Sequence, residues 1–187
     1  MIFDMKFSED EFFKLELNSN LVFENCEFSA ISFQAVSLRS IEFVNCVFKS
    51  CNLANQDLTN CSFRDVKFEA CNLIGVNWCN LRRLEFPEFS VCKLNFSSFQ
   101  QLKLKKMKVV DCAAVDVDFS GCELAESQFN GSDLSGANFN RANLIKADFR
   151  SAKNYLFDLR NTNIKGIRLS LPEAMNLLRV LGAEVDY

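Results

Sequence analysis

The chain has 187 residues, of which 49% are hydrophobic and 24% are charged, and its formal net charge is −3. These values are typical of a globular domain with a substantial core and exclude a disordered chain. The sequence contains no histidine, which excludes histidine acid–base catalysis, histidine metal ligands and every histidine-containing triad.

The first twenty residues carry acidic and aromatic side chains, as in MIFDMKFSEDEFF. This start lacks the apolar core of a signal peptide, and no apolar run in the chain reaches the roughly 18–20 residues that span a membrane. We therefore predict a cytoplasmic protein with no membrane partner. Because Phe12, Phe13, Leu15 and Leu17 do not follow the spacing that begins at Phe23, residues 1–20 are expected to form an irregular first coil.

From residue 21 to residue 170 an apolar residue recurs at every fifth position, as in SDLSGANFNRANLIKADF, which starts at Ser132. Neither the helical period of 3.6 nor the strand period of 2 gives this spacing. The residue two places before each centre is small or β-branched, and the other three are mainly polar. One residue is inserted within 79–89, and Asn154 is the one polar centre, which predicts a distortion between Ser151 and Tyr155.

Residues twenty apart match in size, which indicates that coils of four units stack in register. At about 4.8 Å per coil, as in a sheet, nearly eight coils make a rod of roughly 35–40 Å. Two predicted columns of stacked centres are Phe28, Phe48, Phe68, Phe89, Val109, Phe129, Phe149 and Leu169, and Leu38, Leu58, Trp78, Phe99, Phe119, Phe139 and Leu159.

The units SDLSG, ANFNR, ANLIK and ADFRS resemble the A(D/N)LXX consensus of the pentapeptide-repeat family. The resemblance implies an all-β fold, a right-handed quadrilateral β-helix, with about eight coils in residues 21–170 of a single domain spanning 1–187.

The repeat stops after Leu169, and SLPEAMNLLRVLGAEVDY predicts a short C-terminal capping helix and tail over residues 171–187. Ser170 is the candidate N-cap, and Gly182 suits the end of the helix. The helix either only caps the rod or also builds a two-fold homodimer contact, which the family resemblance favours. The candidate dimerisation residues are Leu171, Met175, Leu177, Leu178 and Leu181.

Eight of the nine cysteines occupy the small position before a centre, where cysteine acts as a small core residue. Cys79, beside Trp78, is the exception. The sequence contains no CxxC zinc pair, phosphate-binding loop, nucleophile elbow or paired-carboxylate cleft. We therefore predict no enzyme activity, metal site, cofactor or small-molecule substrate.

Charge is segregated along the chain, because six acids and no basic residue lie between Asp111 and Asp133, just after the lysine-rich KLKKMK. One reading is the scattered charge of a solvated face. The other is an acidic stripe along a rod about as wide as duplex DNA, able to compete for a basic DNA-binding groove. The candidate partner-binding residues are Asp57, Asp111, Asp116, Asp118, Glu123, Glu126, Asp133 and Asp158.

The chain length, the Phe- and Leu-centred rod and the ending LLRVLGAEV resemble the topoisomerase-protecting group of the family, which includes McbG, Qnr and MfpA. The segments LIGVNW and FPEFSVCKLNF are most similar to McbG. The resemblance implies a homodimer that binds DNA gyrase, and in some members topoisomerase IV, and relieves poisoning by quinolones or by toxins such as microcin B17. The implied mechanism is DNA mimicry or recognition of the gyrase–DNA complex.

The chain departs from Qnr proteins, whose projecting loops matter for protection, because it has a one-residue insertion instead. This departure favours a protector against a peptide or natural-product poison. Direct nucleic-acid binding is not expected outside a gyrase–DNA complex, given the acidity. The alternative function is a pentapeptide-repeat scaffold for protein–protein interaction with no topoisomerase partner.

Overall fold

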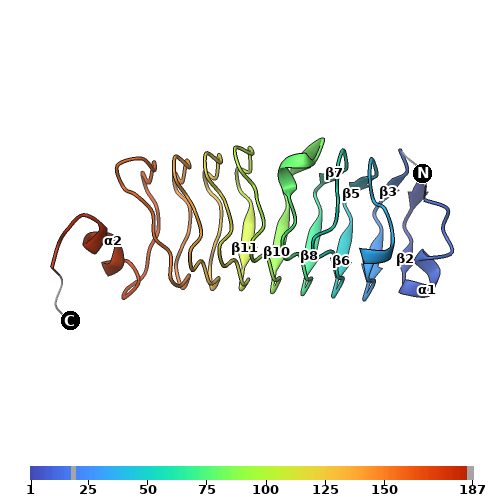
Figure 1. Cartoon of the computed structure of the whole chain (residues 1–187), viewed down its shortest axis with the longest axis horizontal. Coiled ribbons are helices and arrows are strands. Elements are labelled where there is room, and N and C mark those ends of the chain that lie inside the picture. The colour runs from blue at the N-terminus through green and yellow to red at the C-terminus, as the bar shows by residue number, and fades with distance from the viewer. Residues whose placement is uncertain (18–19, 185–187) are drawn as a thin grey trace.

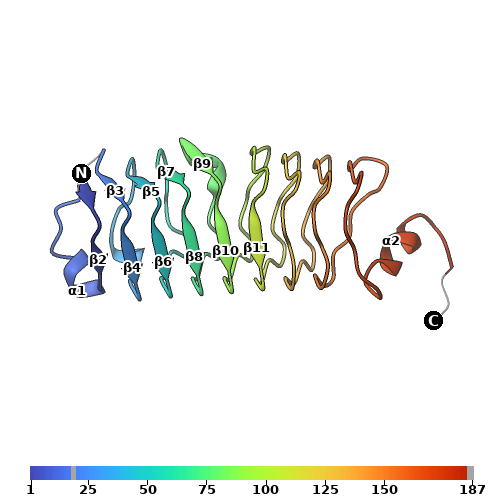
Figure 2. The same ribbon diagram turned by 180° about the vertical axis from the view of Figure 1, so that it is seen from behind.

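The protein is a rod of stacked coils, as a computed structural model describing residues 1–17 and 20–184 shows (Figure 1). The coils stand side by side along the long axis, with the N-terminus at one end and helix α2 (Met175–Val180) at the other. The view from behind shows the same succession of coils (Figure 2). The predicted all-β solenoid with a short C-terminal helix is therefore confirmed.

Two parallel sheets run along the rod, and each coil of its first half contributes one short strand to each sheet. The five-stranded sheet contains β1 (Ile2–Phe3), β3 (Val22–Glu24), β5 (Glu42–Val44), β7 (Ser62–Arg64) and β9 (Arg83–Glu85). The six-stranded sheet contains β2 (Lys6–Phe7), β4 (Glu27–Ser29), β6 (Val47–Lys49), β8 (Lys67–Glu69), β10 (Glu88–Ser90) and β11 (Lys108–Val110). Further along, isolated parallel bridges such as Asp118 with Asn138 continue the stacking.

The inserted residue lies at Leu81–Arg82, directly after the 3-10 helix η2 (Trp78–Asn80). The Asn60 amide still donates to the carbonyl of Asn80, twenty residues on, whereas Ser62 pairs with Arg83, twenty-one residues on. The Arg82 side chain reaches back over the preceding coils, with Nη2 3.0 Å from Glu42 Oε2. The extra residue therefore forms a local bulge that leaves the stacking on either side intact.

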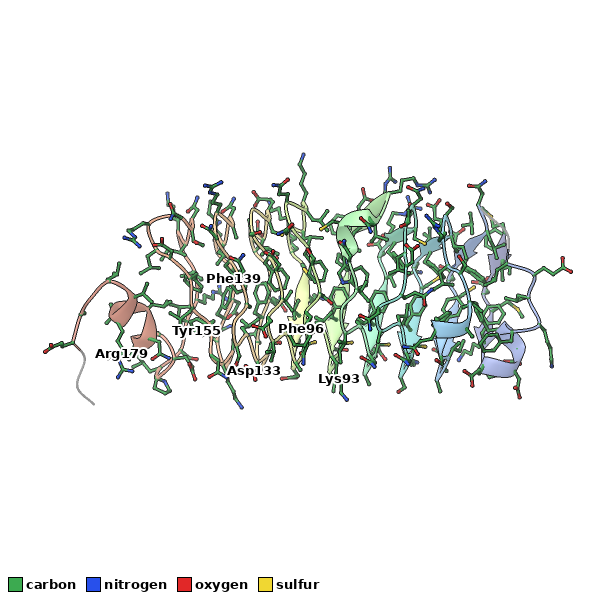
Figure 3. The ribbon with its side chains drawn as sticks, viewed as in Figure 1. Lys93, Phe96, Asp133, Phe139, Tyr155 and Arg179 are labelled. Carbon is green, nitrogen blue, oxygen red and sulfur yellow. The ribbon has the colours of Figure 1, made fainter. Side chains whose placement is uncertain are left out.

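Stacked aromatic rings fill the centre of the rod, as the column prediction requires. The ring centroids of Phe28 and Phe48 are 4.7 Å apart, those of Phe48 and Phe68 are 5.0 Å apart, and those of Phe68 and Phe89 are 5.2 Å apart. All four side chains are buried, and side-chain sticks fill the inside of the coils in Figure 3. Offset stacking of this kind adds to the free energy gained by burying apolar surface.

The small position before each centre also makes hydrogen bonds. The hydroxyls of Ser127 and Ser132 donate to the carbonyls of Leu104 (3.1 Å) and Val109 (2.8 Å) in the preceding coil. The Cys46 thiol donates in the same way to the Phe23 carbonyl, at 3.4 Å. Serine and cysteine therefore leave room for the neighbouring large residue while their buried polar atoms keep a partner.

The N-terminal residues follow the repeat more closely than expected. Strands β1 and β2 pair in register with β3 and β4, so that Phe7 lies beside Phe28. Ile2, Phe7, Phe12 and Leu17 share the five-residue spacing, one place out of phase with Phe23, and Phe12 of helix α1 (Glu9–Phe12) is fully buried. The phase difference made this segment seem irregular in sequence.

The predicted distortion near Asn154 is confirmed. Asn154 is exposed with a φ of 58°, and Tyr155 is buried at that point. Leu159 was predicted to continue the column of Phe139, but Leu159 is only partly buried, and beyond Asn154 it is the buried ring of Phe157 that contacts Phe139, at 6.1 Å. Because Asn154 lies outside the core, a different apolar residue follows in the core.

The C-terminal helix α2 begins at Met175, so the predicted N-cap at Ser170 is wrong. Ser170 Oγ instead accepts a hydrogen bond from the Ser151 amide at 3.0 Å, which ties it to the last coil. Gly182 follows the helix with a φ of 85°, as its predicted role as a stop requires. Within the described residues, no helix is both long and apolar enough to cross a membrane.

The central aromatic stack gives a stability prediction. Phe68→Ala removes a ring that stacks on Phe48 and Phe89 and should lower the free energy of unfolding by about 3–5 kcal/mol. Phe96→Ala is the matched control, because Phe96 is 63% exposed, and its effect should stay within about 0.5 kcal/mol. Denaturant unfolding measures both, and equal losses would contradict the stacked-core description.

Candidate interaction surface

Each unit presents three positions to solvent: the two neighbours of the buried centre, which lie on a flat face, and a corner residue two places after it. Most corner residues have a positive φ between 50° and 72°, and most are Asn, Asp, Ser, Gly or a charged residue. Glycine and short polar side chains adopt this left-handed conformation most easily. The repeat therefore fixes where an outward side chain stands as firmly as it fixes the core.

The six acids between Asp111 and Asp133 surround the rod. Asp118, Glu123 and Asp133 belong to three different inter-coil ladders, with Asn138, Asn143 and Lys153 respectively. Three others, Asp111, Asp116 and Glu126, stand at corners with φ values of 53°, 54° and 62°. We call these six residues the acidic belt. They do not form the predicted stripe along one face, because each unit of five residues turns to the next face.

Five of the six belt carboxylates have no ion pair in the part of the chain that the structure describes. The exception is Glu126, which lies 3.2 Å from Lys105 Nζ. Asp118 and Glu123 instead accept hydrogen bonds from the amides of Asn138 (3.2 Å) and Asn143 (2.9 Å) in the next coil. These neutral donors hold the side chains in place and leave the negative charge uncompensated.

Asp57 and Asp158 are placed differently, since each is compensated by an arginine. Asp57 Oδ2 lies 3.5 Å from Arg39 Nε, and Asp158 Oδ1 lies 2.9 Å from Arg160 Nε. The hydrogen bond from Arg160 lowers the pKa of Asp158. Neither residue adds an unpaired charge to the acidic belt.

Glycines make room for two of the belt carboxylates. A Cβ atom on Gly131 would lie 2.0 Å from Asp111 Oδ1, and one on Gly136 would lie 2.1 Å from Asp116 Oδ1. Both carboxylates therefore lie against the corner of the next coil, where a larger residue would displace them.

The C-terminal end presents an apolar surface. Leu171 and Leu181 are 75% and 56% exposed, Leu178 is also exposed, and Met175 is half-buried. Leu177 is buried against the core, so it caps the rod and is not available to a partner subunit. Four of the five candidate dimerisation residues therefore remain accessible.

The cysteines are free thiols, and all but Cys79 are buried. Burial raises the pKa of Cys46 and Cys122 to about 12 and that of Cys61 to about 11, so these thiols stay protonated and unreactive near neutral pH. Residues 1–17 and 20–184 contain no group of three or more potential metal ligands suited to an ion.

One set of surface residues was missed by sequence reasoning. Phe86, Val91 and Phe96 are exposed at three successive corners of one coil. The signal was available in the sequence, because each stands two places after a centre, where the repeat between the centres Phe23 and Phe149 otherwise carries polar, charged or small residues.

A family model described as "Pentapeptide repeat region" matches residues 20–96 and 79–149. The chain belongs to the pentapeptide-repeat family. A comparison with curated protein sequences gives no match.

Two solved structures show a weaker likeness to this chain. Trypsin-treated QnrB1, described as a plasmid-mediated fluoroquinolone resistance protein, is 20% identical over 100% of this chain and 97% of its own, with a TM-score of 0.49. HetL of Nostoc sp. strain PCC 7120, described as involved in heterocyst differentiation regulation, is 12% identical over 80% and 87% of the two chains, with a TM-score of 0.34. Low similarities of this kind do not assign an activity.

The environment of Asp133 predicts a pH dependence. Hydrogen bonds from Asn154 (2.9 Å) and Ser135 (2.7 Å) lower its pKa. These bonds stabilise the folded protein at pH values above the ordinary aspartate pKa of about 4. This stabilisation is lost as the pH falls through the lowered pKa of Asp133. An NMR titration should show a low pKa that Asn154→Ala raises. An unshifted pKa in the parent protein, or no response to the substitution, would contradict this assignment.

Proposed function

We propose that this protein binds DNA gyrase and protects it from a poison without catalysing a reaction itself. The observation that carries the proposal is the acidic belt, with its five unpaired carboxylates on the outside of a rod whose interior is filled by stacked side chains. It is supported by the resemblance of the repeat and the ending LLRVLGAEV to the topoisomerase-protecting group. The closer likeness to McbG, topoisomerase IV as a second target and a cytoplasmic location remain parts of this proposal.

The belt suggests how such binding would work. Duplex DNA presents about one phosphate charge per 1.7 Å of its axis, so a groove that binds DNA is lined with positive charge. Carboxylates such as Asp118 and Glu123, held by neighbouring amides, offer fixed negative charge to such a groove with little ordering on binding. Because the belt covers one part of the rod, the mimicry would be local and would not follow the whole length of a DNA segment.

The alternative is a scaffold that binds another protein and has no topoisomerase partner. The observation that favours it is the ladder of Asp133, which runs from Lys93 through Ala113 and Asp133 to Lys153. An uninterrupted line of negative charge is therefore absent along that ladder. A gyrase assay separates the two functions.

The gyrase proposal predicts the effect of charge reversal. The parent protein should reduce poison-stabilised DNA cleavage by gyrase, and Asp118→Lys with Glu123→Lys should weaken gyrase binding about tenfold or more. Glu24→Lys with Glu69→Lys is the matched control, with the same charge change on partly exposed residues outside the belt. Binding is measured by surface plasmon resonance and cleavage by gel assay, against a quinolone and a microcin-type toxin.

Two results would count against this proposal. If the parent protein at micromolar concentration leaves both supercoiling and poison-stabilised cleavage unchanged, gyrase is not the partner. If the belt variant and its control bind gyrase equally well, the partner stands but the belt is not its binding surface.

We also propose a homodimer formed through the C-terminal end. Leu178→Asp with Leu181→Asp places charge on exposed leucines and should convert a dimer into a monomer in sedimentation velocity, because an apolar contact would then bury unpaired carboxylates. Leu156→Asp, at a leucine that is 50% exposed on the rod, should leave the dimer intact. A parent protein that sediments as a monomer at micromolar concentration would contradict dimerisation.

A further inference from the structure

Three successive corners of one coil carry large apolar side chains exposed to solvent. Phe86 is 57% exposed, and Val91 and Phe96 are each 63% exposed. Every other non-glycine residue with a positive φ in the described part of the chain is polar, charged or alanine. The departure from the repeat is therefore concentrated at one place, directly after the insertion at Leu81–Arg82.

These corners are unfavourable for the isolated rod. Phe86, Val91 and Phe96 have φ values of 50°, 55° and 61°, a region that bulky and β-branched residues avoid. The equivalent corners of the preceding coil carry Asp65 and Gly75, so the coil does not need an apolar residue there. The φ values are those of the other corners, so it is the residue type that departs from the repeat, and exposed apolar side chains kept at such positions point to a role in binding and not in folding.

Lysines alternate with the apolar corners. Lys93 is exposed between Val91 and Phe96 and has no ion pair among the described residues; Figure 3 shows Lys93 and Phe96 near the middle of the rod. Lys108 pairs with Glu88 at 2.8 Å on the face between Phe86 and Val91.

A second group of lysines lies on the other side of Phe86. The ring borders a shallow depression of about 340 Å³ that is also lined by Glu85, Lys103 and Lys105. Because each unit turns to the next face, Phe86, Val91 and Phe96 border two adjoining faces that meet at Val91. We call Phe86, Val91, Lys93 and Phe96 the corner surface.

We propose that the corner surface binds a segment of a partner protein in which acidic side chains alternate with apolar ones. The apolar side chains of such a segment would cover the corners, and its carboxylates would lie over Lys93 and Lys103, which have no ion pair among the described residues, whereas Lys105 and Lys108 pair with Glu126 and Glu88. This inference is independent of the proposed gyrase function, because the corner surface and the acidic belt share no residue.

The corner surface is less suited to a single-stranded nucleic acid, although an exposed phenylalanine can stack on a base. Asp111 and Asp116 occupy the corners that follow Val91 and Phe96 in the next coil. A phosphate backbone carries a charge at every nucleotide and would be repelled there, whereas a segment with separated acids can place them between the corners.

The binding test uses the full chain and a fluorescein-labelled peptide that alternates glutamates with leucines. Fluorescence anisotropy should show saturable binding that Lys93→Glu weakens about tenfold. Lys153→Glu is the matched control, because Lys153 lies in the same inter-coil ladder and gives the same charge change, and it should leave binding unchanged. A peptide with lysine in place of glutamate and an oligothymidylate of similar length should bind more weakly.

Substitution of the corners themselves separates binding from folding. Phe86→Asn, Val91→Asn and Phe96→Asn together should abolish peptide binding while leaving the thermal midpoint unchanged or higher, since asparagine is common at other corners. Three outcomes would overturn the proposal: no saturable binding of the glutamate peptide, equal or tighter binding of the lysine peptide or oligothymidylate, or a lower thermal midpoint in the triple variant.

Discussion

The structure depends on one constraint, the in-register stacking of each coil on the next. Parallel ladders pair residues twenty places apart, as for Phe23 with Phe43 and for Asp118 with Asn138. The same register places ring on ring in the core and thiol or hydroxyl under carbonyl at the small position. Because each coil buries its apolar residues only against its neighbours, an error of register at one point would expose the core over the whole coil.

Stacking does not restrict the outward residues of the faces and corners, and the two surfaces that we propose are built from these residues. The acidic belt uses faces and corners together and circles the rod, with amide neighbours that fix Asp118 and Glu123. The corner surface lies on the preceding coil, and Phe96 stands directly before Asp116 along its corner. The rod thus presents an acidic and an apolar, lysine-containing surface side by side, each able to bind a partner of opposite character.

Sequence reasoning failed where the local five-residue spacing was overridden by contacts between residues distant in the chain. The first coil was predicted to be irregular because Phe12, Phe13, Leu15 and Leu17 do not follow the spacing from Phe23, yet Phe7 pairs with Phe28 and Phe12 is buried. Asn154 is exposed, and after it the ring of Phe157, not the side chain of Leu159, contacts Phe139. Ser170 suited a helix N-cap, but its hydroxyl accepts a bond from Ser151 instead. In each case the contact that decides the structure comes from another coil, and the local sequence contains no information about that contact.

The sequence by itself determined the solenoid, its five-residue unit, the identity of nearly all core residues and the coil that contains the insertion. This was possible because a periodic core repeats the same pattern of large and small residues in every unit, so that single exceptions do not obscure it. Only the tertiary structure decided that the acids surround the rod, that Arg39 compensates Asp57, and that Leu177 faces the core. The physical reason is that the direction of an outward side chain and its charge partner are set by the turn at each corner and by the coils above and below. Those neighbours lie about twenty residues away in the sequence.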